Sequence, residues 1–194
     1  MNRLDFLKGY VESVRTVLRN LDFDALARVL EVLERAYAER RRVFLSGNGG
    51  SAATALHMAN DLMKTVAKDG GHGFRAISLS DNIATITAIA NDESYAEVFA
   101  GQLMALGEAG DVLIVLSASG NSPNIIRALE VAREMRLTTI GFLGMGGGRA
   151  GSLVDVSIVV PSNEYGPIED VHMMFDHLVT AYFAHLQAQQ RGQS

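Results

Sequence analysis

The sequence predicts an α/β protein in which a parallel sheet is covered by helices on both faces. Apolar strand segments alternate with helical segments along the 194 residues, as in proteins built from strand–helix–strand units. Each strand segment is apolar almost throughout, as expected for a sheet buried on both sides. The sequence contains no linker, low-complexity tract or fixed-period repeat. We therefore expect one domain over residues 1–194.

The first forty residues are typical of two amphipathic helices. Apolar side chains recur there at helical spacing, namely Phe6, Tyr10, Val11, Val14, Val17 and Leu18, then Leu26, Val29, Leu30, Val32, Leu33 and Tyr37. Asp22 or Asp24 can cap the second helix. These helices offer more apolar surface than one small sheet needs. Residues 2–40 are therefore expected to pack against other subunits.

In the rest of the chain strands alternate with helices, except that two helices follow one another between the second and third strands. Strands are predicted at 42–46, 76–79, 112–116, 138–143 and 156–160. Helices are predicted from 51 to about 65, over 83–90, 95–106 and 123–135, and from about 167 to 189. The glycine-dense stretch 145–148 is too short for a domain boundary and is interpreted as a turn.

Composition and charge exclude several functional classes. Apolar residues make up 48% and charged residues 20%, as in ordinary globular proteins. The net charge of -5 argues against general nucleic-acid binding. With no cysteine, the chain has no disulfide and no thiolate ligand, so a metal would need His, Asp or Glu. No apolar run of transmembrane length or signal-peptide core is present, so we expect a cytoplasmic protein without a membrane partner.

Two loops have the composition of an anion site. Residues 47–51 (Gly-Asn-Gly-Gly-Ser) and 117–122 (Ser-Ala-Ser-Gly-Asn-Ser) each follow a predicted strand and precede a helix. Ligands of parallel α/β proteins bind at the carboxyl ends of strands, and helix N-termini there offer free N–H groups to a phosphate. Either loop alone is as well explained as an ordinary turn. Two loops at equivalent positions favour a phosphate site.

Neither loop matches a nucleotide-binding motif. No Lys-Ser/Thr pair follows, as a Walker A loop requires, and GxGxxG is absent. The two loops, together with residues 86–92 (Ile-Thr-Ala-Ile-Ala-Asn-Asp), instead resemble the sugar isomerase (SIS) domain family. Over nearly its whole length the chain is most similar to the phosphoheptose isomerases. These enzymes convert sedoheptulose 7-phosphate to a manno-heptose 7-phosphate.

The resemblance implies a fold, an assembly and a substrate site. The fold is a three-layer α/β/α sandwich around a five-stranded parallel sheet, flavodoxin- or Rossmann-like in outline. The assembly is a homotetramer with active sites at subunit interfaces. The residues implied to bind the phosphorylated sugar are Asn48, Gly49, Gly50, Ser51, Asp92, Ser117, Ala118, Ser119, Ser122 and Glu169. The serines among them are implied to hold the phosphate.

The resemblance also implies one zinc ion and a catalytic pair. The zinc ligands would be His57, Asp61, Glu169 and His177, with Asp61 as the base and His177 as the acid. Asp61 stands where the family has Glu, and Glu169 where it has Gln. His57 and Asp61 share one face of a helix, and Glu169 and His177 share one face of another. Two imidazole nitrogens with two carboxylates suit zinc or a similar divalent ion. Carboxylate and imidazole also suit proton transfer beside a carbonyl.

Some residues leave alternatives open. Gly166-Pro167 and Lys64-Thr65 depart from the family where the distal part of the sugar is recognised, so another phosphorylated sugar remains an alternative substrate, for isomerisation or aldol-type chemistry. A second alternative is a non-catalytic module that binds a sugar phosphate or a replication-initiator protein. Acids and histidines at all four cluster positions favour an enzyme. His172 either supports the metal ligands or packs in the core, whereas His72 and His185 are interpreted as structural.

Overall fold

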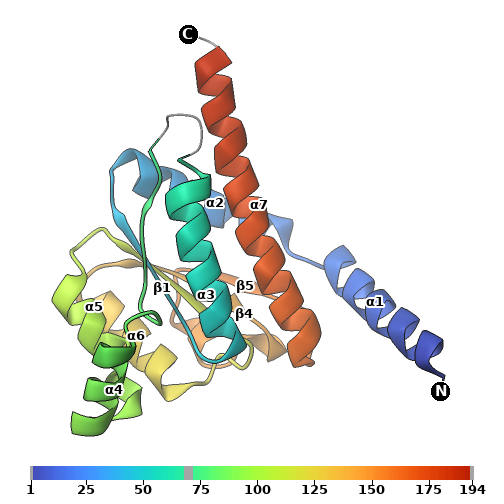
Figure 1. Cartoon of the computed structure of the whole chain (residues 1–194), viewed down its shortest axis with the longest axis horizontal. Coiled ribbons are helices and arrows are strands. Elements are labelled where there is room, and N and C mark those ends of the chain that lie inside the picture. Colours follow the sequence, from blue (N-terminus) through green and yellow to red (C-terminus); the bar gives the residue numbers. More distant parts are fainter. Residues whose placement is uncertain (1, 68–71, 193–194) are drawn as a thin grey trace.

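The computed structural model describes residues 2–67 and 72–192. Its five strands form one sheet in the order β2-β1-β3-β4-β5, and every neighbouring pair is parallel (Figure 1). The strands are β1 (Arg42–Gly47), β2 (Arg75–Ser78), β3 (Val112–Ser117), β4 (Thr138–Leu143) and β5 (Val156–Val159). The parallel sheet predicted from the apolar segments is confirmed.

Helices cover both faces of this sheet, because successive strand residues point alternately to the two sides. One core cluster joins strand residues such as Leu45 and Ile114 to helices α2, α3 and α7. The other joins Phe44 and Leu113 to α5 and α6. These helices are α2 (Phe23–Ala38), α3 (Gly50–Asn60), α5 (Ala100–Leu106), α6 (Pro123–Glu134) and α7 (Tyr165–Gly192). The predicted three-layer α/β/α sandwich is therefore confirmed.

The helix boundaries differ from the prediction in two places. The segment predicted as one helix over 95–106 is a 3-10 turn, η3 (Tyr95–Glu97), followed by α5. The helix predicted from 51 to about 65 is α3 followed by a π-helical turn, η1 (Asp61–Thr65). Of the two candidate caps for α2, Asp22 is the one used, and its Oδ1 accepts a hydrogen bond from the Ala25 N–H (2.8 Å).

The strand order creates a crevice position for a ligand. After β1 the chain forms α3 and β2 on one side, and it then returns so that β3 pairs with the opposite edge of β1. Chain connections therefore leave the ends of β1 and β3 in opposite directions, which is the topological switch point where α/β proteins bind ligands. Both predicted phosphate loops, 47–51 and 117–122, lie at this point.

Two helices expose apolar surface. Helix α1 (Arg3–Arg19) projects from the rest of the chain (Figure 1), and of its residues only Val17 is buried. The Tyr10 hydroxyl connects α1 to α7 by donating to Asp170 Oδ2 (2.6 Å). Helix α4 (Ile83–Asp92) is apolar in sequence but buries no residue completely. In the part of the chain that the structure describes, we find no helix with the length and apolarity needed to cross a membrane.

Candidate functional site

The first loop brings backbone N–H groups to the switch point. A Cβ at Gly47 would lie 2.6 Å from the carbonyl carbon of Ser51, so the turn from β1 into α3 needs glycine there. Gly49 has φ +54° and ψ −122° and stands at the cap position of α3 without a side-chain hydrogen bond. The first N–H groups of α3 thus remain available to an anion.

The second loop presents serine hydroxyls. Ser117 Oγ accepts a hydrogen bond from the Gly120 N–H (3.0 Å), and Ser119 Oγ accepts one from the Asn121 N–H (3.3 Å). Because a hydroxyl both accepts and donates, each retains a proton to give to a phosphate oxygen. Ser122 precedes α6 and forms no side-chain cap bond. Its hydroxyl is also free to donate.

The two loops surround a single cavity of about 120 Å³. Its walls are formed by Asn48, Ser51, Leu116, Ser117, Ala118, Ser119, Ser122, Tyr165 and Glu169. The structure therefore brings most of the predicted substrate residues together, while Gly49 and Gly50 shape the entrance to α3. Asp92 does not line this cavity. It is exposed at the end of α4 and accepts a hydrogen bond from Asn91 (2.8 Å).

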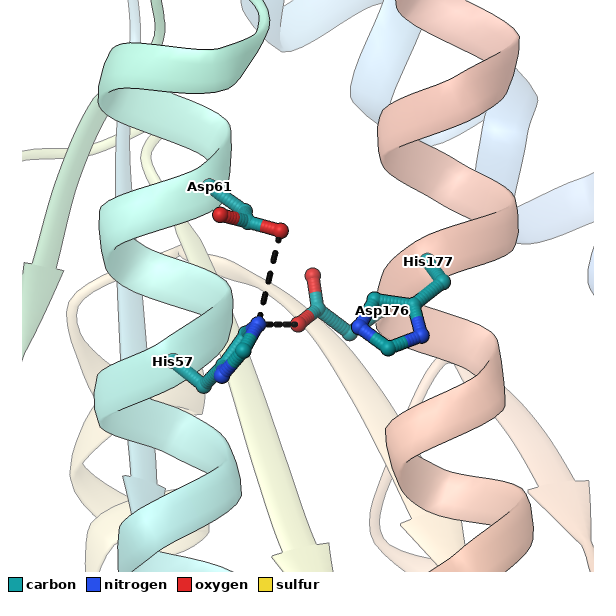
Figure 2. A group of neighbouring side chains, drawn as sticks. All are labelled: His57, Asp61, Asp176 and His177. Carbon is teal, nitrogen blue, oxygen red and sulfur yellow. Dashed lines mark ion pairs between the residues drawn. The ribbon is translucent and has the colours of Figure 1, made fainter.

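A second group of polar side chains lies between α3 and α7. His57, Asp61, Asp176 and His177 each offer one ligand atom, and these atoms all lie within 4.8 Å of one another (Figure 2). His57 Nε2 is 3.5 Å from Asp61 Oδ2 and 3.7 Å from Asp176 Oδ2. The rings of His57 and His177 meet at 68° with centroids 5.4 Å apart. The donor set is one that a divalent metal ion can use.

Comparison with known proteins agrees with this geometry. Residues 9–144 match the family described as SIS domain. A phosphoheptose isomerase from Clostridium acetobutylicum is 37% identical over 174 residues, which cover 89% of this chain and 88% of that protein. This chain belongs to the phosphoheptose isomerases of the SIS domain family.

Solved structures of phosphoheptose isomerases have the same fold. The enzyme from Francisella tularensis superposes with a TM-score of 0.87 at 28% identity, covering 95% of this chain and all of the other (100%). The enzyme from Neisseria gonorrhoeae superposes with a TM-score of 0.84 at 29% identity, covering 93% of this chain and 97% of the other. The likeness therefore includes nearly the whole phosphoheptose isomerase chain.

Asp61 owes its position to the π-helical turn. The Val66 N–H donates to the Asp61 carbonyl five residues earlier (3.1 Å), which inserts one extra residue into the helix. Asp61 Oδ1 accepts hydrogen bonds from Thr65 Oγ1 (3.0 Å) and Asn60 Nδ2 (3.2 Å). Its other oxygen, Oδ2, is thereby left facing His57.

Asp176 is the member of this cluster that sequence reasoning missed. Its side chain is fully buried, Oδ1 accepts from Thr180 Oγ1 (3.4 Å), and Oδ2 has no hydrogen-bond partner. Burial, followed by the nearby charge of Asp61, raises the pKa of Asp176 to about 6. An Asp beside a His on a long helix gives no sequence signal of burial. Only the packing of α3 against α7 shows it.

Glu169 is not one of the four residues of the His/Asp cluster in the single chain, so its predicted role as a metal ligand stays a prediction. Its carboxylate lies against Gly50, where a Cβ would be 2.6 Å from Oε2, and it lines the serine cavity. Eight residues separate Glu169 from His177, or about 12 Å along a helix that rises 1.5 Å per residue. In the single chain the two side chains lie in different parts of the site, Glu169 at the serine cavity and His177 in the His/Asp cluster. The position of Glu169 at the serine cavity agrees with its predicted role in binding the phosphorylated sugar.

The glycine run at 145–148 supports the phosphate loop, although the sequence suggested only a turn. A Cβ at Gly120 would lie 2.0 Å from the Gly147 carbonyl oxygen, and one at Gly148 would lie 2.3 Å from the Ser119 carbonyl oxygen. The Ala150 N–H donates to the Gly120 carbonyl (2.9 Å). Backbone therefore packs directly on backbone beneath the serines. A glycine run so close to a predicted ligand loop was the available signal.

An amide pair orients Asn48, another feature that the sequence did not reveal. Asn48 Nδ2 donates to Asn124 Oδ1 (2.9 Å), and Asn124 Nδ2 donates to Asn48 Oδ1 (2.8 Å). The Tyr95 hydroxyl also donates to Asn48 Oδ1 (3.0 Å). Asn124 is buried at the start of α6. It links the two phosphate loops and fixes the side chain of Asn48 at the cavity.

The other histidines lie outside the cluster. His172 is buried between Phe142 and Phe175, with Nε2 3.3 Å from the Leu143 carbonyl oxygen, and burial lowers its pKa to about 4. His172 is therefore a neutral residue packed in the core, and it does not support the metal ligands. His72 stacks on Tyr37 with ring centroids 4.3 Å apart, and His185 contacts Gln189.

Proposed function

We propose that this chain catalyses the aldose–ketose isomerisation of sedoheptulose 7-phosphate to D-glycero-D-manno-heptose 7-phosphate. The observation that carries the proposal is that the serine cavity and the His/Asp cluster lie on the same pair of helices, α3 and α7. One end of this arrangement suits a phosphate and the other suits proton transfer. Membership of the phosphoheptose isomerases supports the same substrate.

The separation of the two groups matches a seven-carbon sugar. Six residues separate Ser51 from His57 and eight separate Glu169 from His177, or about 9 and 12 Å at 1.5 Å per residue. Both helices begin at the carboxyl edge of the sheet and run in the same direction. Six carbon–carbon bonds of about 1.5 Å each span a comparable length. A sugar held by its phosphate would thus place its carbonyl end near the cluster.

The phosphate would be held by Ser51, Ser117, Ser119 and Ser122. Their hydroxyls line the cavity at the N-termini of α3 and α6, where N–H groups and the helix dipole favour negative charge. Holding the distant phosphate restricts the sugar and so orients the reacting carbons. Asn48, fixed by Asn124, adds a directed amide for a sugar hydroxyl.

Proton transfer would be carried out by Asp61 and His177. The Asp61 carboxylate would remove the proton from the hydroxyl-bearing carbon beside the carbonyl, and protonated His177 would give a proton to the former carbonyl carbon. The hydroxyl proton would move to the former carbonyl oxygen, and the proton held by Asp61 would return to His177 through solvent. We propose zinc as the resident ion, held by the His/Asp cluster, because imidazole and carboxylate ligands without thiolate suit it. When bound, zinc supplies polarisation of the carbonyl oxygen. His57 would position the ion and not transfer the proton.

The assembly and location remain proposals with separate support. We propose a homotetramer, because α1 and α4 expose Phe6, Leu7, Val11 and Ile83 to solvent in the single chain. Active sites at the subunit interfaces would explain how the exposed Asp92 could meet the sugar. The single-domain organisation over residues 1–194 and the cytoplasmic location stay predictions. They are supported by the uninterrupted α/β pattern and the lack of cysteine.

A panel of ketose phosphates tests the proposal. The pure protein is incubated with five-, six- and seven-carbon ketose phosphates, and aldose formation is followed by NMR. We expect the aldose from sedoheptulose 7-phosphate. Conversion of a shorter sugar alone would favour the second candidate function, isomerisation of another sugar phosphate. Lys64 and Gly166, which are exposed, keep this candidate open because they depart from the family where the distal part of the sugar is recognised. Binding without any conversion would support the non-catalytic alternative.

A further inference from the structure

We propose that Asp176 is a metal ligand, supplied from the buried side of α7, and that it completes a centre of two imidazoles and two carboxylates. This inference rests on the metal part of the proposed function. It adds to the site a ligand that the resemblance to the family does not include. In the single chain, Glu169 lies at the serine cavity.

The distances in the cluster fit ligands around one small cation. His57 Nε2 lies 3.5 Å from Asp61 Oδ2 and 3.7 Å from Asp176 Oδ2. No hydrogen bond joins these atoms among the described residues, and bonded N–H···O pairs are normally closer, at about 2.9 Å. Ligand bonds of about 2.0–2.1 Å in a tetrahedron place neighbouring ligand atoms about 3.3 Å apart. The cluster is therefore slightly expanded from a tetrahedral shell.

The hydrogen bonding of Asp176 indicates a missing partner. Most buried polar atoms are paired in folded proteins, yet Asp176 Oδ2 is completely buried, unpaired and directed at His57 (Figure 2). Its other oxygen is held by Thr180, which fixes the direction of the carboxylate. A divalent cation would satisfy the unpaired oxygen.

The charges around Asp176 lead to the same conclusion. The groups that face it are His57 and Asp61 from the α3 side, and His177 and Thr180 from its own helix. Neither of the flanking helices places Lys or Arg in this cluster, so the two carboxylates face one another beside imidazoles. A buried charge without a partner is costly. One divalent cation would balance the charges of Asp61 and Asp176.

The assignment leaves Glu169 with a different environment and role. Its carboxylate lines the serine cavity and lies against Gly50, at the N-terminus of α3. From there it can contact a sugar hydroxyl. Glu169 and Asp176, two of the three acidic residues of α7, would thus serve separate ends of the substrate.

Metal titration of the full chain tests the assignment. The protein is stripped with a chelator, and Zn²⁺ and Co²⁺ are titrated by calorimetry and by Co²⁺ absorption. Asp176→Asn keeps the shape of the side chain and its contact with Thr180, so it should fold. We expect it to weaken metal affinity by at least about 10–100-fold, which is the loss seen when a residue that only hydrogen-bonds to a metal ligand is replaced. The matched variant Asp170→Asn, on the same helix, should bind as the wild type does.

Thermal unfolding gives a second readout. In the metal-free state, Asp176→Asn removes an unpaired buried charge, so its midpoint should rise by about 2–4 °C. The stabilisation by added Zn²⁺ should be smaller than in the wild type. Unchanged metal affinity in Asp176→Asn would overturn the inference. If the wild type binds neither ion, the metal proposal also fails. Isomerase activity of the wild type, assayed separately, decides the proposed function in either case.

Discussion

His57 Nε2 lies 3.7 Å from Asp176 Oδ2, although the two residues belong to α3 and to the C-terminal helix α7. The contact exists because both helices pack on the same face of the sheet, in one core cluster. It places a fully buried carboxylate beside an exposed imidazole. The chemistry we assign to this protein is therefore located where two distant segments meet.

The serine loops should carry most of the affinity for phosphate. We expect the double variant Ser119→Ala, Ser122→Ala to bind a ketose 7-phosphate about 10²–10⁴-fold more weakly, since each of the two lost hydrogen bonds to a charged group contributes about 1.5–3 kcal/mol. Calorimetric titration measures the change. Ser13→Ala, on exposed α1, is the control and should bind normally. Wild-type affinity in the double variant would place the phosphate elsewhere.

The glycine turn at 145–148 should support sugar-phosphate binding and stability through its contact with the phosphate loop 117–122. Gly148 and Gly146 both have positive φ, but only at Gly148 would a Cβ collide with the Ser119 backbone, at 2.3 Å. Gly148→Ala should therefore weaken sugar-phosphate binding and lower the unfolding midpoint more than Gly146→Ala does. Gly146 (φ 78°, ψ 7°) is near the left-handed helical region, where alanine costs about 1 kcal/mol, whereas Gly148 (φ 54°, ψ −156°) is near a region that alanine avoids more strongly. Equal effects would show that the contact with the loop has no role.

Apolar residues on α1 should hold subunits together. Leu7 and Val11 are 61% and 66% exposed in the single chain, which is unusual for residues at helical spacing on one element. The double variant Leu7→Asp, Val11→Asp should shift the protein from a tetramer to smaller species in light scattering. Glu12→Gln, one position away, should not. A wild-type protein that is monomeric at micromolar concentration would refute the assembly.

His172 should make stability depend on pH. Its pKa is lowered to about 4 by burial, against 6.5 in an unfolded chain. Between these values the unfolded state binds a proton that the folded state does not, so falling pH favours unfolding. Relative to His172→Gln, the wild type should lose about 1.4 kcal/mol of stability per pH unit from pH 6.5 to 4. Denaturant unfolding at several pH values measures this difference, and a constant difference would contradict it.

The fold could be predicted from the sequence because it depends on local patterns. Apolar runs such as Thr138–Leu143 can only be buried strands, and turn chemistry marked the switch between strand and helix at Gly47 and Ser122. The strand order, by contrast, depends on which connections pack best, and the sequence does not reveal it. The break between η3 and α5 also follows from tertiary packing, since Val98 and Phe99 are buried there.

The candidate site could be predicted where its residues cluster in one loop, and not where its residues meet only through packing. Ser117, Ser119 and Ser122 are recognisable because glycine and serine cluster in one loop. Asp176 is not, because burial of a carboxylate depends on α3 covering it. Asn124 is not, because its partner Asn48 is on another loop. Glu169 and His177 share a helical face in the sequence, but only the structure shows that the Glu169 carboxylate lies at the serine cavity.

The central claim is that this chain isomerises sedoheptulose 7-phosphate with the cluster between α3 and α7, and one NMR assay tests it most directly. Aldose formation is followed with the wild type, with His177→Ala and with His185→Ala, a histidine on the same helix outside the cluster. We predict conversion by the wild type and His185→Ala, and a loss of about 10²–10⁴-fold in rate for His177→Ala, which should still bind the sugar phosphate. No aldose from the wild type, or an unchanged rate in His177→Ala, would contradict the account.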